Sequence, residues 1–307
     1  MVRVSSFGQQ QILIQHLMQN QVRLFDDQRQ VTTGKIADDF AGLAGKTNTS
    51  LGARSFFSRT ESYQSTIKTV RGKMDAYDVQ LNGILDSARD FEQFVRISIG
   101  QSTAEGFSEM LDQTYGFTST ALNTSIGGSY IFAGTKTGVA PIQETNLTNM
   151  VALPAVGDVF ANSLNKFVGR IADGVEMEFG VLASDVGQDL FTVLKDIKDF
   201  NTGPSGPLQG NLTQTQVDFL KAKLLEIGTA IEGIQKLQVR NGLGFKRLDV
   251  VESQHADTAI FLEKFISDIE DVNMAEAISN LNKDQLVLEA SYRSIGQLGN
   301  LSLLKFL

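Results

Sequence analysis

Apolar residues between positions 63 and 95 recur at alternating spacings of four and three residues. Their positions are Tyr63, Ile67, Val70, Met74, Tyr77, Leu81, Ile84, Ala88, Phe91 and Val95. This repeat keeps the side chains on one side of a helix and is typical of a coiled-coil seam. It predicts a long helix that packs against a second helix.

A second seam with the same spacing covers residues 217–269. Its members are Val217, Leu220, Leu224, Ile227, Ile231 and Ile234, followed after polar Gln238 and Asn241 by Phe245, Leu248, His255, Ala259, Leu262, Ile266 and Ile269. The phase of the repeat continues across the Gly242-Leu243-Gly244 segment. We therefore expect one long helix with a weak point at these glycines, rather than two helices.

Both ends of the chain are helix candidates with almost no charge. No Asp, Glu, Lys or Arg occurs between Gly8 and Val22, and Lys305 is the only charged residue between Ser294 and Leu307. Such helices are poorly suited to water and well suited to packing against other subunits on several sides. We expect their apolar stripes to form an assembly interface. These residues are Phe7, Ile14, Leu17, Leu24, Val31, Ile278, Leu281, Leu288, Tyr292, Ile295, Leu298, Leu301 and Leu304.

The middle of the chain has a different pattern. A shorter helix is expected over about 104–126, with Phe107, Leu111, Thr114, Phe117 and Leu122 as possible inward positions, and Gly127-Gly128 is a helix stop. Short apolar segments punctuated by Gly and Pro then predict, in chain order, a strand running into a turn at 129–137, two strands at Lys166–Ile171 and Val175–Leu182, a helix at Asp189–Phe200 and an exposed loop at 201–207.

These elements predict a mainly α protein. We expect an elongated coiled-coil rod of long antiparallel helices, paired N- and C-terminal helices, and a small mixed α+β insert. The predicted domains are a terminal helix pair (1–45 with 273–307), a helical rod (46–140 with 213–272) and a mixed, β-rich outer insert (141–212).

Composition narrows the classes of function. The chain has 307 residues, a net charge of −8 and no cysteine. Negative charge disfavours binding to nucleic acid and anionic membranes, and the absence of Cys excludes disulfides and thiol nucleophiles. We see neither a cleaved signal peptide nor an apolar stretch near the ~20 residues of a membrane span. If the protein leaves the cell, we expect a route without a cleaved signal.

Candidate catalytic side chains are few. His16 lies in the uncharged N-terminal segment and His255 lies on the second seam, so we interpret both as packing or solvated residues. The neighbouring carboxylates at 26–27 and 38–39 point about 100° apart on a helix and suit capping better than proton sharing. Segment 134–137 lacks the glycine that directly precedes Lys in a phosphate-binding loop. We predict a protein that is not an enzyme and that uses no cofactor or metal.

Five segments carry a resemblance to a known family. They are Met1-Val2-Arg3-Val4-Ser5, Val31-Thr32-Thr33-Gly34-Lys35 with Asp38-Asp39, Ser129-Tyr130-Ile131-Phe132-Ala133-Gly134-Thr135-Lys136-Thr137, Arg240 with Gly244, Arg247 and Leu248, and Ala290-Ser291-Tyr292 with Leu301-Ser302-Leu303-Leu304. As a set they resemble bacterial flagellins, and most of all the flagellin-like proteins of the hook–filament junction.

The resemblance covers roughly residues 1–140 and 210–307, and it implies a structural subunit of the bacterial flagellum. Such subunits are exported through the flagellar type III apparatus without a cleaved signal, and their terminal helices form the inner wall of a tube outside the cell. The implied partners are further copies of the chain, the adjacent axial proteins on the hook and filament sides, and an export chaperone. The two seams would then form the core of the rod.

Three alternatives stay open. Phe40 with the following Ala-Gly-Leu-Ala is more similar to filament flagellins, which favours a short filament flagellin. A secreted coiled-coil effector or translocator would share the rod but would not need two matched, uncharged ends. Finally, Arg89 with Phe91 and Glu92 could form a surface that a host receptor reads, as the equivalent helix of flagellins does.

Overall fold

The two apolar seams form two long helices. The structure is a computed structural model that describes residues 6–300. Helix α2 covers Thr47–Gln101 and helix α6 covers Gln214–Glu270, without interruption at Gly242 or Gly244. The prediction of one continuous helix over the second seam is confirmed, and the fold is mainly α as expected.

The chain divides into two compact units. One unit comprises residues 1–59 and 257–307, and the other comprises residues 60–256. Both boundaries fall inside α2 and α6, so the units share these helices. The predicted division into three domains stays a prediction.

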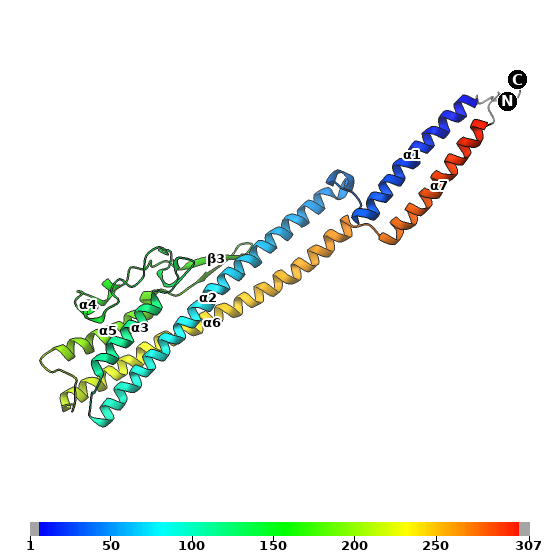
Figure 1. The fold of residues 1–307 in the computed structure, drawn as a ribbon. Coiled ribbons are helices and arrows are strands. Elements are labelled where there is room, and N and C mark those ends of the chain that lie inside the picture. Colours follow the sequence, from blue (N-terminus) through cyan, green and yellow to red (C-terminus); the bar gives the residue numbers. More distant parts are fainter. Residues whose placement is uncertain (1–5, 301–307) are drawn as a thin grey trace, which may run out of the picture. The chain divides into compact units, whose positions relative to one another are not determined.

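The first unit is built on a pair of terminal helices. Helix α1 (Ser6–Thr33) packs against helix α7 (Met274–Asn300), as Figure 1 shows. A short 3-10 helix, η1 (Phe40–Lys46), connects α1 to the start of α2. Its first turn is capped by the carboxylate of Asp39, which accepts a hydrogen bond of 2.8 Å from the Gly42 N–H.

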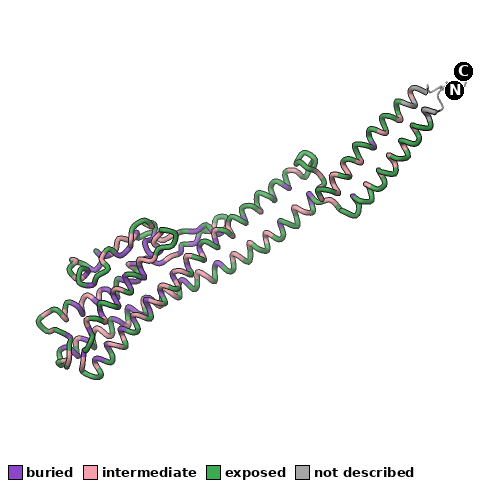
Figure 2. Tube along the Cα trace, in the orientation of Figure 1, coloured by how far each residue is buried: buried purple, intermediate pink, exposed green. Residues whose placement is uncertain are grey.

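The second unit contains the main hydrophobic core. Its remaining elements are, in chain order, α3 (Phe107–Leu122), β1 (Ser125–Ile126), β2 (Ser129–Tyr130), η2 (Ile131–Ala133), α4 (Leu147–Val151), η3 (Val156–Val159), β3 (Phe167–Ala172), β4 (Val175–Phe179) and α5 (Ala183–Thr202). Helix α5 packs against α3, α4 and η3. Figure 2 shows buried residues concentrated on these helices and on the neighbouring parts of α2 and α6.

Two antiparallel hairpins make up the β structure of the described residues. Strand β1 pairs with β2, and β3 pairs with β4, with Phe167 opposite Phe179 and Val168 opposite Glu178. The alternating pattern turns Gly169 and Met177 inward, where they are buried, and leaves Val168 and Glu178 exposed.

The structure corrects three details of the prediction. The strand expected over 129–137 ends at Tyr130, because residues 131–133 are all buried and form a 3-10 turn, whereas a strand would alternate between two faces. The helix expected over 104–126 covers only 107–122, and Phe117 is 48% exposed rather than inward. The helix expected from Asp189 begins at Ala183, since Val186 extends its buried face.

Candidate assembly surfaces

Uncharged polar side chains connect the terminal helices α1 and α7. Asn20, which is buried, donates a 3.3 Å hydrogen bond from Nδ2 to Oγ of Ser291. One position further, Nε2 of Gln21 donates to the hydroxyl of Tyr292 at 2.7 Å. These contacts explain part of the unusual Gln and Asn content of both ends: amides make contacts between helices without burying a charge.

The residues predicted to form the assembly interface fall into three groups. Half-buried positions are Leu17, Leu24, Val31, Leu281, Leu288 and Ile295. Exposed positions are Ile14, Ile278 and Tyr292. The side chains of Phe7 and Leu298 and the whole of Leu301 and Leu304 lie outside what the structure describes. Since α1 packs against α7, a role of the half-buried stripe between subunits stays a prediction.

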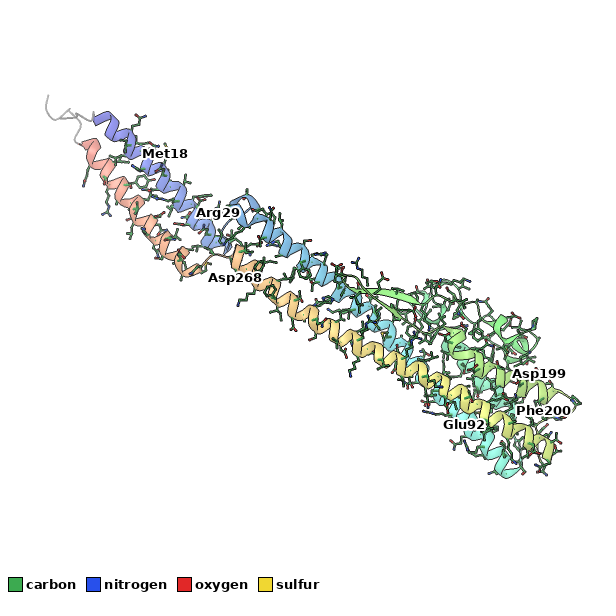
Figure 3. The ribbon with its side chains drawn as sticks, turned by 180° about the vertical axis from the view of Figure 1, so that it is seen from behind. Met18, Arg29, Glu92, Asp199, Phe200 and Asp268 are labelled. Carbon is green, nitrogen blue, oxygen red and sulfur yellow. The ribbon has the colours of Figure 1, made fainter. Side chains whose placement is uncertain are left out.

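Helix α1 also carries a second apolar face, which the sequence reasoning missed. Met18, Val22 and Phe25 are 59%, 62% and 68% exposed, and Ile14 precedes Met18 by one helical turn. A shallow groove of about 550 Å³ runs past Met18 and Val22 (Figure 3 labels Met18). The 4-4-3 spacing of these residues could have predicted this face. The stripe through Leu17 and Leu24 fits a helical repeat equally well, however, so spacing does not tell which of the two is buried. Contiguous exposed apolar side chains are characteristic of interaction sites, so this face is a candidate for contact with another molecule.

A pair of carboxylates lies between α1 and α7. Asp27 Oδ2 is buried and has no hydrogen-bond partner among the described residues. Burial raises the pKa of Asp27, and the charges of Asp284 and Asp26 raise it further, while Arg23 opposes the shift. Arg23 Nε lies 3.6 Å from Asp284 Oδ2, so the guanidinium partly compensates the acidic pair.

Glu270 is the centre of a charged cluster where the connecting segments meet. It accepts hydrogen bonds from Ser50 Oγ and from Arg54, whose Nε lies 2.7 Å from Oε1. Lys35 Nζ lies 3.6 Å from Glu270 Oε2 and also pairs with Asp271. The hydrogen bonds from Arg54 lower the pKa of Glu270 to about 2, with Ser50 and Lys35 adding to the shift against the effect of burial.

Backbone hydrogen bonds reinforce this cluster. Ile36 N–H donates to Glu270 O at 2.8 Å, and Val272 N–H donates to Gly34 O at 3.0 Å. Gly34 has a φ of 70°, a conformation that glycine adopts without strain. The segment after α1 and the segment after α6 are thus fastened by one antiparallel bridge and by ion pairs. Sequence reasoning did not find this site, because its members are separated by more than 200 positions.

The predicted rod core is largely buried. In the second unit the buried seam residues are Ile67, Val70, Met74, Tyr77, Leu81, Ile84, Phe91, Val95, Leu220, Ile227, Ile231 and Leu248, and Tyr63, Leu224 and Phe245 are half buried. In the first unit Leu262 and Ile269 are buried and Ile266 is half buried.

Neither histidine belongs to a site with catalytic geometry. His16 is exposed. His255 stacks on Tyr63, with ring centroids 5.5 Å apart, and its Nε2 lies 2.7 Å from Ile171 O. Among the described residues no group of three or more His, Cys, Asp or Glu could hold a metal ion. In the same part of the chain, no helix combines the length and apolar character that a membrane crossing requires.

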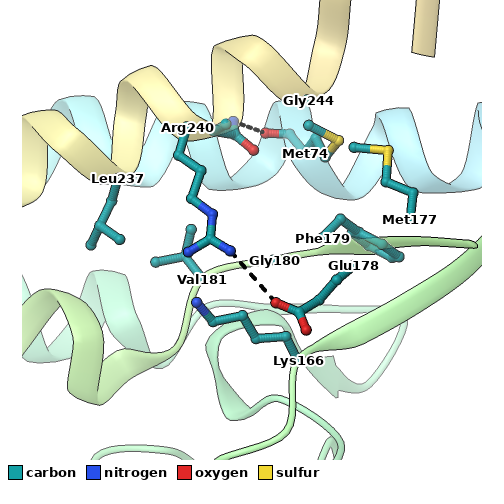
Figure 4. A pocket seen from close by; sticks show the side chains of 11 residues that line it. Met74, Lys166, Met177, Glu178, Phe179, Gly180, Val181, Leu237, Arg240 and Gly244 are labelled. Atoms are coloured by element: carbon teal, nitrogen blue, oxygen red, sulfur yellow. Dashed lines mark hydrogen bonds and ion pairs between the residues drawn. The ribbon is translucent and has the colours of Figure 1, made fainter. Parts of the chain in front are cut away.

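A small cavity lies where β4 meets α2 and α6 (Figure 4). Its volume is about 60 Å³, and its lining includes Met74, Met177 and Gly244. Arg240 and Glu178, 3.6 Å apart, are at its edge. This volume holds a few water molecules at most, so we interpret the cavity as a packing defect rather than a substrate site.

The structure also corrects the proposed receptor surface on α2. Phe91 is fully buried, and its ring packs edge-on against the ring of Phe107, with the ring centroids 6.3 Å apart. Arg89 and Glu92 therefore remain on the surface without the aromatic residue between them, each in an ion pair with a neighbour of its own helix. Phe91 belongs to the core.

Comparisons with known proteins show what this chain is similar to. Residues 224–307 match the bacterial flagellin C-terminal helical region. No curated protein sequence matches the chain. Its fold is similar to a solved structure from Vibrio parahaemolyticus described as a flagellar hook-associated protein, with 20% identity, 76% of this chain and 99% of that one covered, and a TM-score of 0.59.

Two further structures give the same result. FlgL of Bacillus cereus is 16% identical, with 70% of this chain and 98% of that chain covered and a TM-score of 0.56. FlgL of Xanthomonas campestris is 11% identical, with 70% of this chain and 99% of that chain covered and a TM-score of 0.56. At these identities the likeness establishes a shared fold, and residues 224–307 match the model of the flagellin C-terminal helical region.

Proposed function

We propose that this protein is a structural subunit of the bacterial flagellum at the hook–filament junction. The observation that supports this proposal is the combination of a flagellin C-terminal region at 224–307 with a fold that covers almost the whole length of three proteins named as hook-associated or FlgL. The apolar faces of α1 and α7 would make the contacts between subunits. The protein acts by assembly and not by catalysis.

The proposal implies a set of partners and a location. The chain contacts further copies of itself and the axial proteins on its hook and filament sides. It leaves the cell through the type III export apparatus, kept competent by an export chaperone, and lies outside the cell in the flagellum.

Immunogold electron microscopy of the source bacterium tests this function. A single band of label where the hook meets the filament is the expected result. Label along the filament would replace the proposal by the alternative of a short filament flagellin, which the Phe40 segment favours. Label absent from flagella would overturn both and favour a secreted coiled-coil protein.

A matched pair of variants tests the role of the terminal helices. Phe25→Ser removes an exposed aromatic side chain from α1, and Leu225→Ser removes an exposed apolar side chain from α6. Because neither residue belongs to the core, both variants should fold. We expect Phe25→Ser to weaken the junction band and Leu225→Ser to leave it unchanged. Equal effects would show that α1 has no special part in assembly.

A further inference from the structure

Helix α6 carries a run of positive charge in an otherwise acidic protein. Residues 233–248 contain four cations and neither Asp nor Glu, whereas the whole chain has a net charge of −8. The cations Lys236, Arg240, Lys246 and Arg247 are all exposed. Arg240 forms an ion pair of 3.6 Å with Glu178, while the other three make no hydrogen bond or ion pair with any residue that the structure describes. Most of this positive charge is therefore not compensated within the chain.

Three apolar side chains lie among these cations on the same side of the helix. Val239 and Leu243 are each 64% exposed, and Val250 is 54% exposed. Leu243 follows the buried Asn241 by two residues, which corresponds to a rotation of about 200° around the helix. The apolar residues thus point away from the seam that joins α6 to α2.

The spacing on this outer face is that of a second coiled-coil seam. Residues seven positions apart form a middle row and two flanking rows, namely Lys236, Leu243 and Val250; Val239 and Lys246; and Arg240 and Arg247. Apolar residues three and four positions apart, with charges beside them, are the pattern through which one helix selects another. From position 236 to position 250 the face is about 21 Å long, which is the length of two heptads.

We propose that this face binds a helix of a different protein, one that carries Asp or Glu beside apolar residues at the same spacing. The apolar side chains around Leu243 pack against those of the partner, and the four cations pair with its carboxylates. The apolar centre supplies most of the affinity, and the charges select the partner and its register. The inference goes beyond the proposed function, because it assigns an interaction surface outside the terminal helices.

A second copy of the chain is poorly matched to this face. Two copies of the face itself would bring like charges together, which is unfavourable. The acidic face of α2 exposes Asp75, Asp86 and Asp90, but Val79 is its single exposed large apolar residue within 60–96. That face offers negative charge without the repeated apolar residues that a seam requires. The partner is therefore a different protein.

The surroundings of the face favour a narrow partner over a flat anionic surface. Glu178 lies beside Arg240, and exposed Glu232 and Asp249 lie at the two ends of the basic segment. A membrane on this face would bring these carboxylates against its anionic headgroups. A helix is only about 10–12 Å wide with its side chains and contacts the basic and apolar rows alone.

Photo-crosslinking in the source bacterium tests the proposal. The photoreactive amino acid p-benzoylphenylalanine is introduced at position 243 of the full chain, and the adducts formed on irradiation are identified by mass spectrometry. The matched control carries it at position 225, because Leu225 is 76% exposed on α6 but lies outside the basic segment. We expect at least ~10-fold more adduct with one other protein from position 243, the linked peptide being a helix with Asp or Glu beside its apolar residues.

Charge reversal tests the basis of recognition. Lys236→Glu with Arg247→Glu should lower the yield of this adduct at least ~10-fold, because like charges then face each other. Lys221→Glu with Lys264→Glu changes the net charge equally at other exposed positions of α6 and should leave the yield unchanged. Since all four lysines and arginines are exposed, the variants should fold, which circular dichroism checks. Replacing the partner's mapped carboxylates by Lys should restore the adduct with the reversed chain.

Several outcomes would overturn the proposal. These are an adduct with a second copy of this chain, equal yields from the two positions, the absence of any protein adduct, and a yield that the charge reversal does not change. Sedimentation of the purified chain with vesicles of phosphatidylglycerol and phosphatidylcholine in equal parts is the companion measurement. Vesicle binding that is lost in Lys236→Glu with Arg247→Glu would assign the face to a membrane instead.

Discussion

The terminal helix pair and the unit of residues 60–256 are both helical, but they are stabilised in different ways. Asn20 is the only buried side chain on α1, and Ala277 the only one on α7, among those described. The second unit, in contrast, buries a continuous cluster of apolar residues, including Tyr77, Phe91 and Phe191.

The contrast shows which part of the molecule folds on its own core. Burial of large apolar side chains is the main source of stability, and the second unit has such a core within one chain. The pair α1/α7 instead exposes Met18, Val22 and Phe25 and leaves Asp27 Oδ2 without a hydrogen bond. Contacts with other subunits would complete this pair, whereas the second unit already has its core within one chain.

The largest expected difference comes from removing one aromatic residue in each region. Tyr77 is fully buried, donates its hydroxyl to Ile131 O at 2.6 Å and packs edge-on against Phe132. Tyr77→Ala should lower the free energy of unfolding by ~3–5 kcal/mol. Phe25→Ala on α1 should change it by less than ~0.5 kcal/mol, since the side chain is exposed. Urea unfolding followed by tyrosine fluorescence measures both, and comparable losses would contradict the comparison.

Glu270→Gln tests the charged cluster of the first unit. The substitution leaves Arg54 and Lys35 without their shared carboxylate, and we expect local stability to fall by ~1–3 kcal/mol. Hydrogen exchange of the Ile36 and Val272 amides, both hydrogen-bonded across the bridge, is the readout. Exchange in the second unit should not change, and a uniform increase over the chain would contradict a local role.

The same cluster predicts a dependence on pH. Because the pKa of Glu270 is lowered to about 2 in the folded protein, its contribution is complete above the unfolded pKa of about 4.3 and is lost as the pH falls toward 2. Protection of the Ile36 amide against hydrogen exchange should decrease as the pH falls over this range in the natural chain. In Glu270→Gln the decrease should be much weaker, and an unchanged pH profile would exclude Glu270 as its cause.

Two glycines on α6 test the close packing of the second unit. A methyl group at Gly242 would meet no atom within 4 Å, whereas one at Gly244 would lie 2.5 Å from Met74 Cε and 3.0 Å from Met177 Cε. Gly242→Ala should stabilise the protein by ~0.5–1 kcal/mol through helix propensity. Gly244→Ala should lose this gain. Thermal unfolding of both variants measures the difference. Equal stabilisation would show that Met74 and Met177 move away from the added methyl group at little cost.

The smallest expected effect concerns Asp27. Its pKa is raised in the folded protein, so ionisation weakens the α1/α7 pair, and the penalty grows as the pH rises through and above the unfolded pKa of about 3.9. Asp27→Asn removes the charge next to Asp284 and should stabilise the pair near neutral pH by less than ~1 kcal/mol. Amide exchange in α1 should slow near neutral pH and respond less to acidification. Faster amide exchange in Asp27→Asn than in the natural chain would mean that the charged carboxylate of Asp27 makes a stabilising contact.

The sequence by itself determined the helices. A seam repeat is local information: each turn of α2 and α6 carries its own apolar residues, so their continuity through Gly242 and Gly244 could be predicted from spacing alone. The same holds for the uncharged terminal helices and for the β3–β4 hairpin, whose strands alternate between two faces.

Only the tertiary structure decided which faces meet. Helix α1 has two apolar stripes of similar spacing, and the pairing with α7 selects the one through Leu17 and Leu24. The cluster of Lys35, Ser50 and Glu270 joins positions far apart in the chain, and no periodicity predicts such a contact. Phe117 could not be assigned from spacing alone for the same reason: burial depends on the elements that pack nearby, while periodicity records only the direction in which a side chain points.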